Sequence, residues 1–423
     1  QVWADSVARP LDEAERERII SAHEQLAGEG MRVLGVAFRL LDARPAEVSA
    51  DALERDLTFL GQVAMIDPLR QEAKGAVATC KAAGIRPVMI TGDHPQTARQ
   101  IAGELGMLTN DRILTGQELE RMSAQELEAV VEDVSVYARV SPEHKLKIVE
   151  ALQARGEIVA MTGDGVNDAP ALKKADIGVA MGLKGTDVSK EASDLVLLDD
   201  NFATIVAAVE EGRLIYDNIR KFIKYVVTGN CGKLWMMLVG PFIGIPLPLL
   251  PLQILWINFV TDGLPGLALS VEPAERDIMK RPPRHPNESL LGRGMGAHIL
   301  TVGLLSGSLA LGVGYAYWRS GNPAWQTMIF LIVVLAQMGQ ALAIRSGRDS
   351  IFHIGFLSNR PLFAVVILTA ALQIAVVYVP VLQGVFRTVA LPLRDLAFAL
   401  VISTAIFWYV EAEKWWLRRA ARS

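Results

Sequence analysis

The sequence predicts a protein of two parts: an α/β domain with a doubly wound, mostly parallel sheet, followed by a bundle of six membrane-spanning α-helices. Two observations support this fold class. Short apolar strands alternate with helical stretches over residues 67–212. From about Phe222 onward, six apolar stretches are long enough to cross a bilayer, which takes about 20 residues each. We expect the stalk and bundle to occupy residues 213–423.

Residues 1–66 are predicted to be the C-terminal remnant of another domain. They contain one helical stretch around Leu11–Gly28, with Asp12 placed to cap it, and two strands at Met31–Phe38 and Leu57–Ile66. This is too little structure to bury a core of its own. The chain also begins with Gln1 rather than methionine, so we expect that an N-terminal portion is missing.

In the α/β domain, polar residues follow the strands directly. Thr91-Gly92-Asp93 comes after Val88–Ile90, and Thr162–Asp168 comes after Ile158–Met161. Ser141-Pro142 follows a third strand and opens a helix that carries Lys145 and Lys147. Ligands of this fold bind at the carboxyl ends of the strands. Each group alone is usually a turn or a surface residue, but together they suit a phosphate and Mg²⁺.

Two further motifs make a family resemblance specific. Met161–Gly182 is similar to the hinge signature of P-type ATPases. Asp67-Pro68-Leu69-Arg70 matches their aspartate-proline-proline-arginine hinge, with Leu69 in place of the second proline. Thr91-Gly92-Asp93 with Thr97-Ala98 matches their phosphate-binding loop. The chain therefore resembles the C-terminal half of a P-type cation-transporting ATPase of the calcium-pump branch, and residues 67–212 resemble its HAD-like phosphorylation domain.

The resemblance implies roles for individual residues in binding ATP and Mg²⁺. Asp164 resembles the Mg²⁺ ligand, and Lys147 resembles the lysine at the transferred phosphoryl group. Asp168 resembles the second carboxylate of the signature. The residues implied to contact phosphate or nucleotide are Arg32, Thr91, Gly92, Asp93, Arg139, Lys147 and Asn167.

One departure concerns the nucleophile. The family phosphorylates an aspartate in an Asp-Lys-Thr-Gly-Thr motif, which this sequence does not contain. The actuator motif, the first four membrane helices and most of the nucleotide-binding domain are also lacking. Because phosphoryl transfer depends on an aligned nucleophile, we expect this chain alone to be inactive and to need the missing N-terminal half as its partner.

The distribution of basic residues predicts the orientation of the bundle. The six stretches run near Phe222–Ile243, Leu252–Val271, Met295–Trp318, Trp325–Ile344, Pro361–Tyr378 and Leu396–Trp408. The loops after the second and fourth stretches and the C-terminus are rich in lysine and arginine, whereas the opposite loops carry only Arg319, Arg387 and Arg394. By the positive-inside rule, the soluble domain lies on the cytoplasmic side of the membrane, which we expect to be a bacterial plasma membrane.

The second stretch is predicted to bind the transported ion. Asn258 and Asp262 are four residues apart and share a helix face with Thr261, while Gly263 and Pro265 loosen the helix. A carboxylate at membrane depth is costly and usually marks an ion path. The oxygen ligands suit a hard divalent cation such as Ca²⁺. The segment also resembles the sixth membrane helix of calcium pumps, where matching side chains bind the ion.

The neighbouring stretches carry two departures from two-ion calcium pumps. Asn230 and Lys233 lie on the first stretch, and Lys233 occupies a position where those pumps are expected to carry glutamate. Gln337 replaces another glutamate on the fourth stretch. We hypothesise that Lys233 serves as a built-in counter-charge and that one ion is carried per cycle; the alternative is that Lys233 extends to the membrane interface.

Other readings remain open at this point. A pump for Mn²⁺ or for several divalent cations fits the same oxygen ligands. A membrane-anchored HAD-type phosphatase and an inactive, truncated chain are alternatives of other classes. The net charge of −4 gives no reason to expect nucleic acid, and Cys80 and Cys231 suggest neither a disulfide framework nor a thiolate metal site.

Overall fold

The computed structural model describes residues 1–4, 7–28, 31–41, 49–65, 68–292 and 294–420. The chain forms two compact units. The first comprises Gln1–Ala208 with Met279–Pro283, and the second comprises Val209–Ile278 with Arg284–Ser423. Two residues of predicted elements lie outside the described residues: Ile66, the last of a predicted strand, and Asp67, the first of the predicted hinge motif.

The N-terminal segment is a four-stranded sheet with a helix. The strand order is β2-β1-β4-β3, with bounds Val7–Arg9, Val2–Ala4, Thr58–Met65 and Arg32–Phe38. Helix α1 spans Glu13–Gly28, and the Asp12 carboxylate accepts the Glu15 N–H at 2.7 Å, which confirms the predicted cap. Helix α1 buries none of its residues, and a short helix, α2, spans Ala50–Leu53. The expectation that this segment is a domain remnant stays a prediction.

The rest of the first unit alternates strands and helices as predicted. The strands are β5 Met89–Ile90, β6 Ile113–Thr115, β7 Val136–Ala138, β8 Ala160–Gly163, β9 Ile177–Met181 and β10 Leu195–Leu197. The helices are α3 Gln71–Ala82, α4 Pro95–Glu104, α5 Gly116–Arg121, α6 Ala124–Val130, α7 Pro142–Ala154, η1 Val166–Asp168, α8 Ala169–Lys174 and α9 Asp187–Glu191. Strand β6 and helices α3, α5, α6 and α9 were not predicted.

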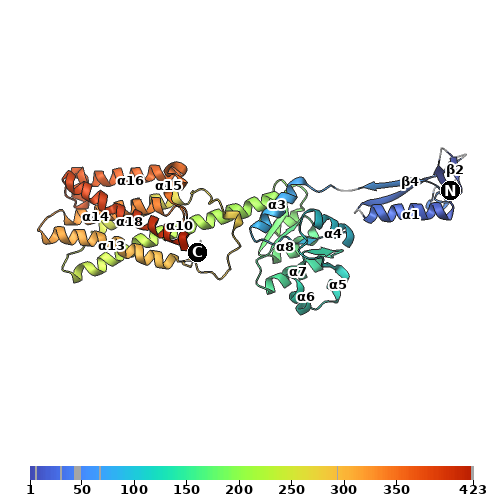
Figure 1. Cartoon of the computed structure of the whole chain (residues 1–423), viewed down its shortest axis with the longest axis horizontal. Coiled ribbons are helices and arrows are strands. Elements are labelled where there is room, and N and C mark those ends of the chain that lie inside the picture. The colour runs from blue at the N-terminus through green and yellow to red at the C-terminus, as the bar shows by residue number, and fades with distance from the viewer. Residues whose placement is uncertain (5–6, 29–30, 42–48, 66–67, 293, 421–423) are drawn as a thin grey trace. The chain divides into compact units, whose positions relative to one another are not determined.

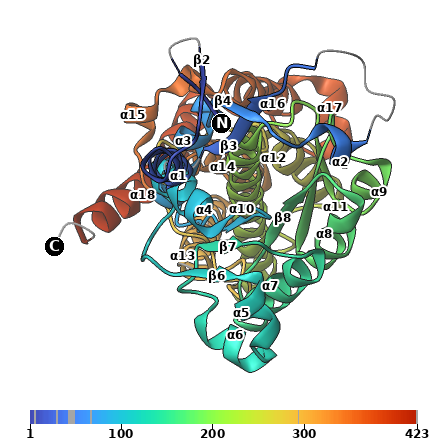
Figure 2. The ribbon, with the colours of Figure 1, turned by 90° about the vertical axis from the view of Figure 1, so that its right-hand side faces the viewer.

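The strands form two sheets where one was expected. The orders are β5-β7-β6 and β10-β9-β8, and every pairing is parallel. Figure 2 shows β6 and β7 side by side, with α5 and α6 beyond them. Strand β5 is at the edge of one sheet and β8 is at the edge of the other. We identify these as the edges that face each other, because Ile90 and Val159 pack against the same two hydrophobic clusters. Among the described residues, no strand pairs with both edges.

Tyr137 on the central strand β7 lies in the interior of this core. Its side chain is fully buried, and its hydroxyl has no hydrogen-bond partner among the described residues. Burial raises the pKa of Tyr137 to about 12, so the ring stays neutral at any physiological pH.

The second unit is a helical bundle. Helix α10 is one continuous helix of 41 residues, Phe202–Phe242, which begins in the first unit and ends in the second. The remaining long helices, α13, α14, α16 and α18, lie side by side in Figure 1. Their bounds are Met295–Arg319, Trp325–Ala343, Arg360–Tyr378 and Leu393–Ala420. The shorter ones are α11 Pro251–Trp256, η2 Ile257–Gly263, α12 Leu264–Leu269, η3 Ile278–Lys280, α15 Ile351–Ile354, η4 Phe356–Ser358 and α17 Pro380–Phe386.

Five helices of the described chain are long and apolar enough to cross a membrane, so the predicted count of six is not fully confirmed. They are Pro251–Leu269, α13, α14, α16 and α18. The first predicted span, Phe222–Ile243, corresponds to the C-terminal half of α10, which carries Lys224 and Lys233 and does not meet the same criteria. The last span continues well beyond Trp408, to Ala420. Helix α14 contributes most to the core, with Met328–Val334 buried.

Candidate functional site

The loops after β5 and β7 are joined by hydrogen bonds at the carboxyl edge of their sheet. Thr91 donates its hydroxyl to the Asp93 carboxylate at 2.7 Å. The Arg139 and Val140 N–H groups donate to the carbonyls of Asp93 and Thr91, at 3.1 and 3.2 Å. Arg139 adopts a left-handed backbone conformation, with φ of 50°. The structure thus brings together three residues that were predicted to bind phosphate or nucleotide.

The loop after β8 is built around the buried carboxylate of Asp168. Its Oδ1 accepts the Lys145 ammonium at 2.6 Å, and its Oδ2 accepts the N–H groups of Asp164 and Gly165, both at 3.3 Å. Glycine is required at position 163, because a Cβ there would stand 2.6 Å from the Cβ of Asp168. Asp168 therefore fixes the backbone of the loop and ties it to α7.

The predicted place of Lys147 is corrected by this geometry. Its ammonium donates to the carbonyls of Leu119, at 2.6 Å, and Met122, so it satisfies the C-terminal end of α5. Lys145 faces the Asp168 loop instead. Side chains two positions apart on an α-helix point about 200° away from each other. Lys145 and Lys147 therefore cannot both face that loop. The geometry therefore makes Lys145 the lysine that faces the loop of Asp164 and Asp168.

Asp164 presents its carboxylate to solvent. The side chain is exposed and accepts no hydrogen bond from the part of the chain that is described. Its backbone is nevertheless held, because the Asp164 carbonyl accepts the Thr186 N–H at 3.0 Å and the Ser189 hydroxyl at 3.2 Å. Asn167 is exposed beside it. A carboxylate on a fixed loop suits Mg²⁺, which is often held by one or two carboxylates, waters and substrate phosphates.

Most of the other residues predicted to contact phosphate or nucleotide are exposed to solvent. Gly92, Asp93 and Arg139 are exposed. A Cβ at Gly92 would meet nothing within 4 Å, so this loop has room in front of it. Arg32 lies in β3, and its side chain is outside the described set. Within the described residues, no group of three metal-ligating side chains forms a metal site by itself.

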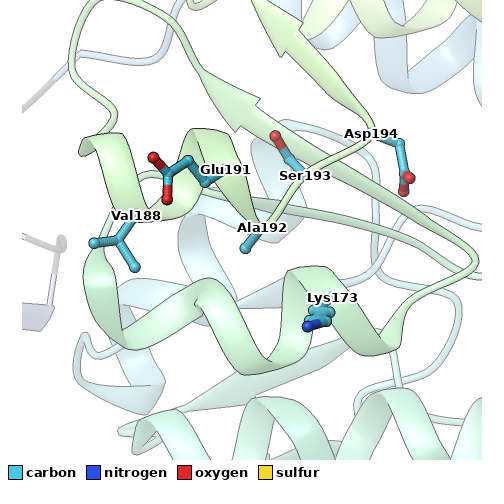
Figure 3. A pocket seen from close by; sticks show the side chains of 6 residues that line it. All are labelled: Lys173, Val188, Glu191, Ala192, Ser193 and Asp194. Atoms are coloured by element: carbon cyan, nitrogen blue, oxygen red, sulfur yellow. The ribbon is translucent and has the colours of Figure 1, made fainter.

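The first unit also has a hollow, and none of these predicted residues lines it. Figure 3 shows its side chains, which come from α8, α9 and the segment that joins α9 to β10. They are Lys173, Val188, Glu191, Ala192, Ser193 and Asp194. The Asp194 carboxylate already accepts the Gly178 N–H at 2.9 Å. One of the two acidic side chains of the hollow is therefore bonded to strand β9.

In the second unit, two of the predicted ion ligands, Asn258 and Asp262, meet in a group that we call the Asp262 cluster: Lys233, Asn258, Asp262 and Gln337, of which Asn258 is exposed and the other three are buried. The Lys233 ammonium donates to Asp262 at 2.6 Å and to Asn258 at 2.7 Å. The Gln337 amide donates to the other Asp262 oxygen at 3.1 Å. The side chains of Lys233 and Asp262 are each only 7% exposed, so this is an ion pair inside the bundle rather than a lysine extended to an interface.

The backbone around Asp262 is irregular. Residues Ile257–Gly263 form a π-helical turn, as the glycine and proline spacing suggested. Tyr225 is fully buried and donates its hydroxyl to the Thr261 carbonyl at 2.6 Å. The Thr261 hydroxyl and the Gln337 carbonyl oxygen are buried and have no partner among the described residues. These oxygens are the kind of group that a hard cation would satisfy.

Two residues of α10 differ from the sequence-based picture. Asn230 is exposed and makes no hydrogen bond within the described chain, so the structure does not bring it to the cluster. Tyr225 was not singled out, although its spacing of eight residues from Lys233 places both on one face of a helix. Gly229 is needed for the contact with α14, because a Cβ there would lie 2.1 Å from the Gln337 amide nitrogen.

The chain matches two family models. Residues 3–176 match the haloacid dehalogenase-like hydrolases, and residues 246–416 match the C-terminus of cation transporting ATPases. The first covers the soluble site, and the second covers Asn258, Asp262 and Gln337.

Curated relatives match over most of the chain. It is 48% identical over 386 residues to a calcium-transporting ATPase of Bacillus subtilis, which covers 90% of this chain and 43% of the relative. It is 39% identical to calcium-transporting ATPase 1 of Saccharomyces cerevisiae, over 97% of this chain and 44% of the relative. It is 40% identical to calcium-transporting ATPase type 2C member 1 of Bos taurus, over 94% and 41%. The chain thus spans less than half the length of these relatives.

Proposed function

Because the chain belongs to the P-type cation-transporting ATPases and corresponds to the C-terminal half of a pump of the calcium branch, we propose that it supplies half of an ATP-driven exporter of a divalent cation, Ca²⁺ by preference. The other half would come from the N-terminal part that the relatives possess. The observation that carries the transport proposal is the buried Lys233–Asp262 ion pair, since an anchored phosphatase would need no carboxylate between membrane helices.

In the soluble part, the proposed reaction is transfer of the γ-phosphoryl group of ATP to an aspartate outside this chain. A bond forms between a carboxylate oxygen and phosphorus, and ADP leaves. Lys145 would place its charge near the transferred group, in the role expected of Lys147, while Asp168 orients it. Thr91, Gly92 and Asp93 would bind phosphate oxygens. Arg32, Arg139 and Asn167 would contact the nucleotide.

Mg²⁺ fits the exposed Asp164 carboxylate as one ligand of a site completed from outside the chain. When bound there, it would offset the charge of the phosphate oxygens. The chain's own contribution is to hold Asp164 still, through the hydrogen bonds to its carbonyl and N–H.

The sheet edges support a specific place for the missing nucleophile. One parallel strand inserted between β5 and β8 would convert two three-stranded sheets into the single doubly wound sheet that the sequence predicts. The residue after such a strand would arrive between the loops of Thr91 and Asp164. The clusters shared by Ile90 and Val159 supply the apolar floor for it.

In the membrane part, we propose one transported ion per cycle. Its ligands would be Asn258, Thr261 and Asp262 together with groups from the missing fourth membrane helix. Lys233 would act as a built-in counter-charge: its single positive charge already balances Asp262, so a divalent cation needs a further carboxylate from outside this chain. Asn230 is left out of this ligand set because, within the described residues, its side chain makes no hydrogen bond to the Asp262 cluster, whereas Asn258 accepts one from Lys233.

The charge distribution supports a cytoplasmic position for the soluble part. The membrane in question would be a bacterial plasma membrane, as expected from the composition and from the relative in Bacillus subtilis.

The test is cation-stimulated ATPase activity of the complete pump in membranes. Free Ca²⁺, Mn²⁺ and Mg²⁺ are varied, and the wild type is compared with Asp262→Asn. We expect stimulation by micromolar Ca²⁺ that the substitution abolishes. Stimulation by Mn²⁺ alone would keep the pump and change its ion, whereas activity indifferent to every cation and to Asp262 would overturn the transport proposal. Counting Ca²⁺ ions bound per phosphorylated pump tests the stoichiometry, and a ratio of two would exclude one ion per cycle.

A further inference from the structure

A second buried polar group ties together the same helices that carry the Asp262 cluster. We call it the Glu272 cluster: Asn218, Glu272, Arg345 and Asn359. Arg345 and Glu272 are 1% and 4% exposed. The Arg345 guanidinium faces the carboxylate as a fork, with Nε 3.0 Å from both Glu272 oxygens and Nη2 2.8 Å from one of them. Such fork-shaped pairs fix orientation as well as charge.

The other contacts leave little freedom for either partner. Asn359 donates to Glu272 Oε2 at 2.7 Å and to the Ala268 carbonyl at 3.1 Å. Arg345 also donates to the carbonyl of Gly355 at 2.9 Å and to the hydroxyl of Ser358. Both charges are therefore satisfied on several sides, as a buried ion pair must be to persist.

The Glu272 cluster also includes the stalk helix. Asn218 on α10 is 3% exposed and donates to the carbonyls of Glu272 at 2.8 Å and Ser270 at 3.2 Å. Lys221, one turn further along α10, lies 3.5 Å from Glu275. The segment that follows α12 is thus attached to α10 through its backbone and to α14 and α16 through its carboxylate.

The two clusters use the same three elements in the same order. Helix α10 contributes Asn218 to one and Lys233 to the other, separated by about 22 Å along the axis. The η2–α12 segment contributes Asp262, and Glu272 lies three residues after α12 ends. Helix α14 contributes Gln337, and Arg345 follows directly after its C-terminal cap. Both ends of this three-helix contact are therefore fixed by a carboxylate of the central element.

The central element needs this second attachment. Asp262 lies in a π-helical turn, and the helix after it, α12, has only six residues. A π-helical turn interrupts the regular α-helical hydrogen bonding just before α12, and helices often kink at such turns. Where α12 ends, at Ala268–Glu272, its backbone carbonyls accept hydrogen bonds from Asn218 of α10 and from Asn359.

We infer that the Glu272 cluster is a positioning group for the transport site: it sets the register of α10, α12 and α14, so that Asp262 meets Lys233 and Gln337. This inference rests on the proposed function for its effect on the cation, but not for its effect on the helices. Removing the Glu272–Arg345 fork should weaken cation binding without removing any ligand, as outer contacts of metal sites do, by about tenfold.

The experiment separates positioning from stability. Glu272→Gln or Arg345→Gln alone leaves one buried charge unpaired and is expected to impair folding. The double variant Glu272→Gln/Arg345→Gln buries no charge, so in the complete pump it should fold. We expect its half-saturating Ca²⁺ concentration for ATPase activity to rise about tenfold relative to wild type. Arg345→Lys keeps the charge and loses the fork. Its half-saturating Ca²⁺ concentration should lie between those of the wild type and the double variant.

A matched control comes from the same two segments. Arg348 and Asp277 form an ion pair at 3.5 Å with side chains 75% and 38% exposed. Arg348→Gln/Asp277→Asn removes two charges of the same type from the surface, and it should leave the half-saturating Ca²⁺ concentration unchanged. If both double variants behave alike, the inference is overturned.

A second readout does not depend on transport. Cys231 is half-buried on α10, two residues from Lys233, and Cys80 is the other cysteine of this chain. In the complete pump with Cys80→Ser and every cysteine outside this chain also replaced, the rate at which a membrane-permeant maleimide labels Cys231 should rise several-fold in the Glu272→Gln/Arg345→Gln variant. An unchanged rate, with an unchanged Ca²⁺ requirement, would assign the Glu272 cluster a purely structural role. If the wild type shows no cation stimulation, the proposed function fails, and the labelling rate alone decides this inference.

Discussion

Asp164 and Asp262 each place a carboxylate where a cation is expected, but the two regions hold that carboxylate in opposite ways. The Asp164 side chain is exposed and accepts no hydrogen bond from the described residues, while its backbone is fixed. Asp262 is 5% exposed and accepts hydrogen bonds from Lys233 and Gln337 on its two oxygens. The first is open to a ligand, and the second is already paired within the chain.

The difference follows from the solvent available to each carboxylate. Water solvates Asp164, so its charge can remain unpaired until a metal ion and a phosphate arrive. Between membrane helices no water offsets the charge of Asp262, and an unpaired buried carboxylate would cost several kcal/mol. Lys233 provides the offset from within the chain. A soluble site can therefore be left half-built, whereas a membrane site must be neutral in every state.

The largest effect should come from removing that offset. Lys233→Met keeps the length of the side chain and leaves Asp262 buried without its cation, so we expect the unfolding free energy to fall by about 3–5 kcal/mol. Thermal unfolding in detergent micelles, followed by tryptophan fluorescence, is the measurement. The double variant Lys233→Met/Asp262→Asn should recover most of the loss, because no charge is then left unpaired.

Asp164→Asn is the counterpart in the open region. The same exchange of carboxylate for amide is expected to leave the unfolding temperature at its wild-type value, because no described side chain loses a partner. If Lys233→Met proved as stable as wild type, or if Asp164→Asn proved strongly destabilising, the contrast between a paired and an open carboxylate would be wrong.

The next effect distinguishes two lysines on one helix. In the complete pump, Lys145→Ala should slow formation of the phosphorylated protein from ATP by about 100-fold to 1,000-fold, since it removes a positive charge aimed at the reacting group. Lys147→Ala should leave that rate close to wild type and cost about 1–3 kcal/mol of stability, because the carbonyls of Leu119 and Met122 lose a charged donor.

Rapid-quench phosphorylation with labelled ATP measures the first effect, and thermal unfolding measures the second. The reverse assignment would show itself as a slow Lys147→Ala variant and a normal Lys145→Ala variant. In that case Lys145 would serve only to hold Asp168.

These two lysines also show how far the sequence leads in the soluble part. Strand and helix positions followed from apolar runs and caps: a helix was predicted to open at Ser141-Pro142, and α7 begins at Pro142. The loops with Thr91 and Asp168 were predicted from strand ends, and hydrogen bonds do connect them to the neighbouring elements. The sequence could not place the two lysines, which are separated by about half a turn of helix, because their placement depends on the direction in which the helix presents each side chain.

In the membrane part, spacing along one helix was sufficient and contacts between helices were not. Asn258 and Asp262 were grouped correctly because they lie four residues apart on one element. Asn230 was included as a polar residue on the neighbouring stretch, and within the described residues its side chain makes no hydrogen bond to the cluster. The Glu272–Arg345 pair was not foreseen, because its partners are 73 residues apart and nothing in either segment specifies the other.

The smallest effect compares two glycines of the soluble loops. A Cβ at Gly163 would stand 2.6 Å from the Asp168 Cβ, so Gly163→Ala should displace that carboxylate and cost about 1–3 kcal/mol. A Cβ at Gly92 would meet nothing within 4 Å, so Gly92→Ala should change stability by less than about 0.5 kcal/mol. Thermal unfolding of the two variants measures this difference. If Gly92 is where phosphate approaches the backbone, its alanine variant should instead weaken inhibition of the ATPase by inorganic phosphate. Equal destabilisation by both alanines would mean that Gly92 is as tightly enclosed as Gly163, and the soluble site would then lack the open side on which its contrast with the Asp262 cluster depends.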